Sequence, residues 1–261
     1  MSKHENFIMT SITQEIEDAL SAICAVGDGI ETYPLSEYFM HSLFLKITGF
    51  QEQKLRCIVW ELGTDDFEFR RWLLSESSLG QYSSYRNKND IYVKIVERIS
   101  DIDLSFSINS IDKNKIKRKT IKSVKDVFEN TILSLFSQRK YLYFVSNIEK
   151  IIDDEQILVG KKNFFKDDSK NTSKKGGSKN TSETESFKSL LEYYKELYQQ
   201  RNRLAHNILS YQDNLPSLVK LYDEDDSSRN YFIWITILVL IDNIFMELYR
   251  IHKDVLEKFN Y

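Results

Sequence analysis

The sequence is poor in the residues that interrupt helices. Its 261 residues include only 2 prolines and 8 glycines, and both residue types are unfavourable inside a helix. Hydrophobic residues make up 41% of the chain and aromatic residues 13%, which is sufficient for a hydrophobic core. The composition therefore predicts a mostly helical globular protein.

Cysteines, excess charge and long apolar runs are also scarce. The two cysteines, Cys24 and Cys57, lie far apart in apolar surroundings, so neither a disulfide framework nor a cysteine metal site is indicated. The net charge is -3, and any surface that binds nucleic acid must therefore be a local patch. The most apolar run, 231–241, is much shorter than the roughly 20 residues of a membrane span. With no signal-peptide pattern at the N-terminus, we expect a cytoplasmic protein without membrane contact.

Apolar residues recur at helical spacing along most of the chain. The segment 102–111 instead alternates apolar and polar residues, so a short strand and a loop or irregular helix both fit it. Gly49 is expected to break or kink a helix, and Asp90 is expected to be an N-cap. The predicted helices span residues 5–25, 35–47, 51–62, 67–74, 91–99, 121–136, 141–152, 187–211 and 229–259.

The predicted fold class is all-α, a bundle of about six to eight helices in a single domain. Helix 229–259 is apolar on all sides in its first turns, which places it at the centre of the bundle. The core helices fall mainly within 120–261, and residues 1–112 form an N-terminal helical part that is either a subdomain or part of the same bundle. Residues 163–186 are predicted to be a disordered polar insertion, because almost all of them are polar.

Helix 187–211 carries an arginine, an amide and a histidine within six residues. Arg201 lies within roughly 20° of the middle of the apolar stripe, where a guanidinium is costly unless it has a partner or lines a cleft. Asn202 and His206 are four residues apart and share a face at the edge of the stripe, whereas Arg203 points outward. We expect this helix to pack antiparallel to the apolar helix that follows it.

The segment from Arg201 to His206, RNRLAH, resembles the signature of the HEPN superfamily (higher eukaryotes and prokaryotes nucleotide-binding). Members of this superfamily are α-helical bundles, and many are metal-independent ribonucleases of toxin–antitoxin, abortive-infection and CRISPR-linked defence systems. The resemblance covers about residues 186–261. It implies an RNA substrate, a homodimer with a composite site, an antitoxin or regulatory partner, and catalysis by Arg201, Asn202 and His206 without a metal or other cofactor.

The chemistry of these side chains agrees with the resemblance. Metal-free RNA cleavage needs a base for the 2′-OH proton, an acid for the leaving oxygen and positive charge beside the phosphate. His206 can transfer protons near neutral pH, Arg201 can bind phosphate oxygens, and Asn202 can orient His206 or hold the phosphate. Arg201 and His206 lie roughly 140° apart around a helix, so two copies of the helix would have to face each other to combine them.

A basic run, residues 113–125, is a second candidate for contact with RNA. Lys117, Arg118 and Lys119, together with Arg203, could bind phosphates. A solvated helix face or loop is the alternative, because no aromatic residues interleave with these charges. The predicted function is an endoribonuclease that acts as a toxin or antiviral-defence (abortive-infection) effector, and the alternative is a non-catalytic helical module that binds RNA or a partner protein. Motifs of metal-dependent nucleases and nucleotidyltransferases do not occur in the sequence.

Overall fold

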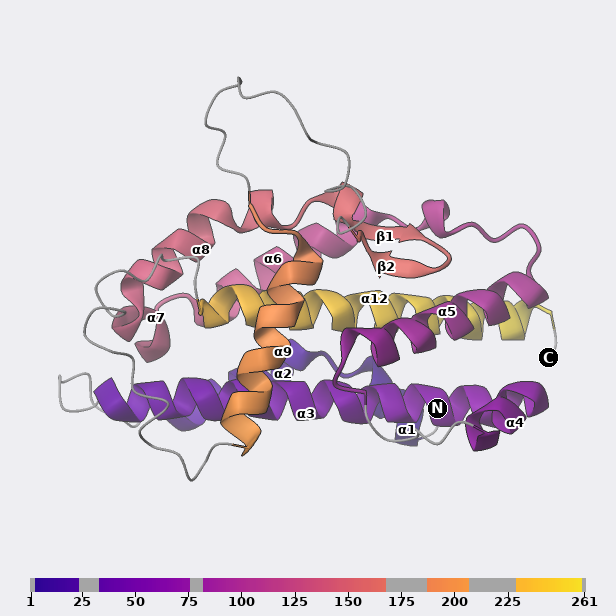
Figure 1. The fold of residues 1–261 in the computed structure, drawn as a ribbon, viewed down its shortest axis with the longest axis horizontal. Coiled ribbons are helices and arrows are strands. Elements are labelled where there is room, and N and C mark those ends of the chain that lie inside the picture. Colours follow the sequence, from indigo (N-terminus) through magenta and orange to yellow (C-terminus); the bar gives the residue numbers. More distant parts are fainter. Residues whose placement is uncertain (1–2, 24–32, 76–81, 168–186, 207–228, 260–261) are drawn as a thin grey trace, which may run out of the picture.

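The fold of the chain is all-α, as the composition predicts (Figure 1). The structure, a computed structural model, describes residues 3–23, 33–75, 82–167, 187–206 and 229–259. Within these ranges there are ten α-helices, two short 3-10 turns and one two-stranded antiparallel hairpin.

The α-helices vary in length from 5 to 33 residues. In chain order they are α1 (Lys3–Met9), α2 (Ile12–Ile23), α3 (Tyr33–Asp65), α4 (Phe67–Ser75), α5 (Tyr85–Ile102), α6 (Lys113–Phe128), α7 (Ile132–Phe136), α8 (Gln138–Ile151), α9 (Leu190–His206) and α12 (Tyr231–Lys258).

Helix α12 is the centre of the bundle, and α2, α3, α5, α6, α8 and α9 all pack against it. Asn230 caps its first turn, because Oδ1 accepts hydrogen bonds from the backbone N–H groups of Phe232 and Ile233 while Nδ2 donates to the carbonyl of Lys140. By length and composition alone α12 could cross a membrane, but 83% of its most apolar 18-residue stretch is buried within the protein. Burial on all sides matches the apolar sequence of its first turns.

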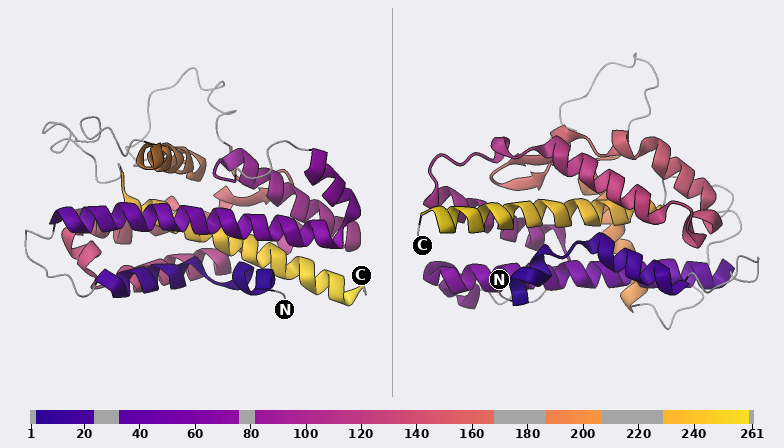
Figure 2. Two further views of the ribbon diagram at one scale, coloured as in Figure 1. Left: turned by 90° about the horizontal axis from the view of Figure 1, so that it is seen from below. Right: turned by 180° about the vertical axis from the view of Figure 1, so that it is seen from behind.

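The N-terminal helices and the C-terminal helices share one hydrophobic core. Buried apolar side chains form a continuous cluster from Ile8 in α1 to Val255 in α12. Residues of the N-terminal part therefore pack into the same interior as those after residue 120, with α3 and α12 lying alongside each other (Figure 2).

Three predicted helix boundaries within residues 1–90 are wrong. Segment 5–25 is not one helix, because the chain breaks between Met9 and Ile12 into α1 and α2. Gly49 lies inside the single long helix α3, and one glycine in a helix costs only about 1 kcal/mol. Helix α5 starts earlier than predicted and is capped by Ser84, whose Oγ accepts a hydrogen bond from the backbone N–H of Asn87, and not by Asp90.

Of the two alternatives for segment 102–111, the loop or irregular helix is confirmed. The segment contains no strand; it ends α5 and then forms the 3-10 turn η2 (Ile108–Ser110). The start of the next helix differs from prediction. Helix α6 begins with the basic run and is capped by Asp112, whose Oδ1 accepts a hydrogen bond from the N–H of Lys115, 2.8 Å away. The basic residues are therefore part of a regular helix, since the cap starts it eight residues before the predicted position.

A short hairpin follows α8 and the 3-10 turn η3 (Asp154–Gln156), and the sequence analysis did not predict it. Its strands are β1 (Ile157–Gly160) and β2 (Asn163–Phe165), which pair antiparallel. Both phenylalanines of β2 are buried, and Tyr85 of α5 holds the hairpin through hydrogen bonds with the backbone of Phe165. The predicted insertion 163–186 therefore starts too early, and its residues 168–186 lie outside the described residues.

Helix α9 runs across α3 and α12 and is not antiparallel to α12 as predicted (Figures 1 and 2). Its buried side chains all lie in its first half, from Leu190 to Leu197. Because the apolar contact is short, the helix can cross its neighbours and does not need to follow them. Residues 207–211 of the predicted helix lie outside the described residues.

Candidate functional site

The predicted catalytic residues lie on the second half of α9. The side chain of Arg201 is 23% exposed and points toward α3, where its Nη2 lies 3.1 Å from Oε1 of Glu52. Its Nη1 donates a hydrogen bond to Oδ1 of Asn202 over 3.2 Å. Arg203 and His206 are exposed, and His206 is the last residue of the helix. The structure thus brings Arg201 and Asn202 together, while no hydrogen bond among the described residues joins His206 to either.

Arg201 lines a small pocket at the place where α9 crosses the bundle. The cavity volume is about 10 Å³, which is room for roughly one water molecule. The lining residues come from α3, α5, α9 and α12 and from the segment before α5: Thr48, Gln51, Glu52, Ser83, Lys88, Tyr194, Leu197, Tyr198, Arg201 and Leu238.

Lys88 is a functional candidate that the sequence analysis missed. Its side chain is 2% exposed, and its Nζ forms no hydrogen bond or ion pair with a described residue. Burial lowers the pKa of Lys88 to about 7; the charge of Glu52 opposes this shift, and the charge of Arg201 adds to it. A lysine that is buried without a partner is energetically costly, so its position calls for a functional explanation.

A sequence signal for Lys88 does exist. Lys88 lies before the predicted helix 91–99, yet it precedes Ile91, Tyr92 and Ile95 at spacings of three, four and seven residues. This spacing puts Lys88 on the buried face of α5. The predicted helix 91–99 does not include Lys88. The buried position of Lys88 can be recognised only when the helix is extended back to its cap at Ser84.

Two further polar side chains of the pocket donate hydrogen bonds to backbone carbonyls. Tyr194 donates a hydrogen bond from its hydroxyl to the carbonyl of Ser83 over 2.6 Å, and burial raises its pKa well above the ordinary value, so it stays protonated. Gln51 donates from Nε2 to the carbonyl of Leu238 over 2.8 Å, and its buried Oε1 has no partner among the described residues. The charged side chains among the described lining residues are Arg201, Lys88 and Glu52, so together they carry a net positive charge when Lys88 is protonated.

A second buried lysine, Lys54, lies in α3 and has a complete set of partners. Its Nζ is 2.7 Å from Oδ1 of Asp242 and donates to the carbonyl of Thr10 over 2.6 Å. Oδ2 of Asp242 accepts a hydrogen bond from the N–H of Ile12. The break between α1 and α2 provides the backbone groups that satisfy this ion pair.

Asp242 lies in α12 and is the buried partner of Lys54. It is 3% exposed and pairs with Lys54, so it is neither solvated nor paired with a residue of α9. Burial raises the pKa of Asp242 and lowers that of Lys54, while their mutual attraction opposes both shifts.

The basic face of α6 is remote from the Arg201 pocket. Helix α6 packs on α2, α8 and α12, whereas α9 packs on α3 and on a different side of α12 (Figure 2). Lys117 lies 3.5 Å from Asp154, and Arg118 and Lys119 are exposed. Within one chain, the two sets of predicted RNA-contacting residues do not form a single surface.

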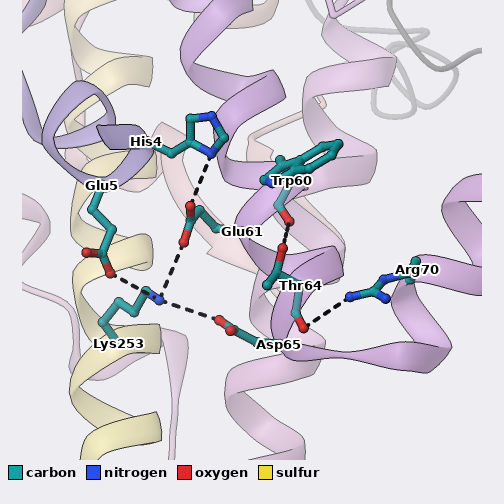
Figure 3. Close-up of polar contacts among 8 residues, drawn as sticks. All are labelled: His4, Glu5, Trp60, Glu61, Thr64, Asp65, Arg70 and Lys253. Atoms are coloured by element: carbon teal, nitrogen blue, oxygen red, sulfur yellow. Dashed lines mark hydrogen bonds and ion pairs between the residues drawn. The ribbon is translucent and has the colours of Figure 1, made fainter. Parts of the chain in front are cut away.

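A further charged cluster joins α1, α3 and α12 (Figure 3). Nζ of Lys253 lies 3.2 Å from Glu5, 3.7 Å from Glu61 and 3.5 Å from Asp65, and Glu61 also contacts Nδ1 of His4 at 3.2 Å. Lys253 lies between the three carboxylates and offsets part of their charge, and the described residues contain no group of three or more His, Cys, Asp or Glu that could hold a metal ion. We interpret this cluster as a structural link.

The fold and the pocket define a helical bundle with a small internal site whose described lining includes two basic side chains and one carboxylate. Comparison of the chain with protein-family models, with curated proteins and with solved structures finds no match. The function must therefore be inferred from the site itself.

Proposed function

We propose that the protein is a metal-independent endoribonuclease in which Arg201 binds the scissile phosphate and His206 transfers a proton. The observation that supports this most is the setting of Arg201. Its side chain is only 23% exposed and lines a pocket whose described residues include a second basic side chain, Lys88, and one carboxylate, Glu52. Such a site favours an anion, and a planar guanidinium can bind two phosphate oxygens at once.

The exposed end of α9 supplies the second part of the proposal. His206 is accessible to a substrate, and an imidazole can serve as acid or base near neutral pH. Because Arg201 and His206 point in different directions from one helix, we propose a homodimer in which His206 of one copy meets the Arg201 pocket of the other. Asn202 would hold the guanidinium in place, and the exposed Arg203 would contact flanking phosphates.

The biological role proposed for this activity is that of a toxin or antiviral-defence effector in the cytoplasm, restrained by an antitoxin or regulatory partner. Lys117, Arg118 and Lys119 would bind RNA only outside the cleavage site, because they lie away from α9. This role rests on the resemblance of the RNRLAH segment to HEPN ribonucleases.

A second candidate function is a non-catalytic module that binds RNA or a partner protein. The ion pair between Arg201 and Glu52 favours it, because the guanidinium already has an anionic partner. In a non-catalytic module, Arg201 would orient α9 on α3 and would take no part in RNA cleavage.

RNA cleavage in the presence of EDTA separates the two functions. We expect the parent protein to cleave single-stranded RNA, and we expect Arg201→Ala and His206→Ala each to lose roughly 100-fold or more in rate. Lys195→Ala is the matched control, because Lys195 is an exposed cation on the same helix. If both variants cleave like the parent, the site assignment is wrong; if the parent cleaves no RNA, the non-catalytic function is correct.

A further inference from the structure

Lys88 is the one described lysine of the pocket, and nothing in the resemblance to HEPN ribonucleases assigns it a role. It reaches the pocket from α5, whereas Arg201 reaches it from α9. Three observations converge on it: the side chain is 2% exposed, its Nζ has no hydrogen bond or ion pair with a described residue, and it lines a cavity. A buried ammonium of this kind is stabilised best by an anion that enters the cavity.

We propose that Lys88 and Arg201 together form a binding site for one tetrahedral oxyanion, the phosphate group of a nucleic-acid strand, and that Glu52 occupies this site until the phosphate displaces it. The inference rests on the proposed function for the identity of the natural ligand, a phosphodiester of RNA. The binding of an oxyanion by the two cations does not depend on cleavage.

Glu52 is suited to the role of an internal competitor. Its carboxylate lies 3.1 Å from Nη2 of Arg201 and its side chain is 14% exposed. The cavity has room for roughly one water molecule, so a phosphate group can enter only if the Glu52 side chain moves. After that exchange the phosphate takes the place of the carboxylate beside Arg201 and adds a second contact, to Lys88, that Glu52 does not make.

Binding of an oxyanion in place of Glu52 also changes the protonation of Lys88. The titratable and charged groups that act on Lys88 are Glu52 from α3, Arg201 from α9 and Asp242 from α12. Because burial lowers the pKa of Lys88 to about 7, Lys88 is neutral in most molecules at pH 8 when the pocket holds no oxyanion. An oxyanion stabilises the charged form, so binding at pH 8 must be accompanied by uptake of close to one proton per site.

Titration calorimetry with inorganic sulfate tests the site directly. Sulfate is a tetrahedral oxyanion that carries no proton of its own at pH 8, and sodium chloride at equal ionic strength serves as the reference. We expect sulfate to bind, Lys88→Met to weaken binding by roughly tenfold or more, and Glu52→Gln to tighten it. Lys94→Met is the matched control, because Lys94 is an accessible lysine on the same helix, and it should bind sulfate like the parent.

The same titration in buffers of different ionisation enthalpy measures the protons taken up. We expect close to one proton for the parent and none for Lys88→Met. This measurement on the parent protein keeps the test valid even if a variant fails to fold. Parent binding without proton uptake, or binding by Lys88→Met that equals that of the parent, would contradict the proposal, as would the absence of sulfate binding.

The outcome is separable from that of the cleavage experiment. If the protein binds sulfate through Lys88 but cleaves no RNA, the oxyanion site is supported and the proposed ribonuclease function is wrong. If the protein cleaves RNA through Arg201 and His206 but binds sulfate equally well after Lys88→Met, the ribonuclease function is supported and the oxyanion site at Lys88 is wrong. Competition with an oligoribonucleotide blocked by 2′-O-methyl groups tests the natural ligand, and we expect it to displace sulfate from the parent.

Discussion

Two buried lysines of this protein, Lys54 and Lys88, have the same exposed fraction of 2% but opposite surroundings. Lys54 lies against a carboxylate and a backbone carbonyl, whereas Lys88 faces a cavity and has no hydrogen bond or ion pair with a described residue. A buried charge is tolerated in a stable core when it is paired and hydrogen-bonded. The difference indicates that Lys54 stabilises the bundle, and it supports the proposal that Lys88 binds a ligand.

The surroundings of each lysine extend this contrast. The pair of Lys54 with Asp242 uses the backbone groups at the break between α1 and α2, at Thr10 and Ile12, so it links α3 and α12 to that break. Lys88 shares its pocket with Arg201, a second cation, and each repels the other. Functional sites are commonly places where stability has been given up for activity.

The largest expected effect is the removal of Lys54. Lys54→Met leaves the buried carboxylate of Asp242 without its cation, and we expect the free energy of unfolding to fall by about 3 to 5 kcal/mol. Urea denaturation followed by circular dichroism measures this change. The double variant Lys54→Met with Asp242→Asn should recover part of the loss, and a single variant as stable as the parent would show that the pair is dispensable.

The corresponding change at Lys88 should have the opposite sign. Lys88→Met removes an ammonium that has no partner in the described part of the chain and keeps a side chain of similar length, so we expect the free energy of unfolding to rise by about 2 kcal/mol near pH 6. Lys94→Met, at an accessible site, should change it by less than about 0.5 kcal/mol. Destabilisation by Lys88→Met would show that Lys88 is a structural residue like Lys54.

The gain from Lys88→Met should also depend on pH. The pKa of Lys88 is about 7 in the folded protein, whereas the ordinary pKa of a lysine, which applies to the unfolded chain, is 10.5. Between these values the unfolded chain binds more protons, so the stability of the parent rises with pH. The stability difference between the variant and the parent should therefore be largest below pH 7 and shrink toward pH 10.5, and denaturation curves at several pH values measure it.

The accuracy of the sequence-based predictions followed the strength of the apolar pattern. Helices α4, α8 and α12 lie close to their predicted bounds because their apolar spacing is strong and no tertiary contact interrupts it. The break between α1 and α2 was not predictable, because the N–H of Ile12 donates there to the carboxylate of Asp242, more than 200 residues away in the sequence. The orientation of α9 was wrong for a related reason: only half of its stripe is buried, and sequence adjacency does not fix a crossing angle.

The candidate site was predictable only in part. Arg201 could be identified because a guanidinium interrupts an apolar stripe, and the structure places it at a polar pocket. The partners Glu52 and Lys88 come from other helices, and no spacing within the sequence connects them to Arg201. His206 and the basic residues of α6 stay predictions, since their roles depend on a substrate or on a second copy of the chain.

The most direct test of the contrast between the two lysines is the titration of Lys88 in the parent protein. Nuclear magnetic resonance of the lysine side-chain carbons follows each ammonium with pH, and Lys88→Met identifies the signal. We predict a midpoint near pH 7 for Lys88, moved upward when sulfate is added. An ordinary midpoint near that of an exposed lysine, unchanged by sulfate, would contradict the assignment of Lys88 as a residue held ready for a ligand.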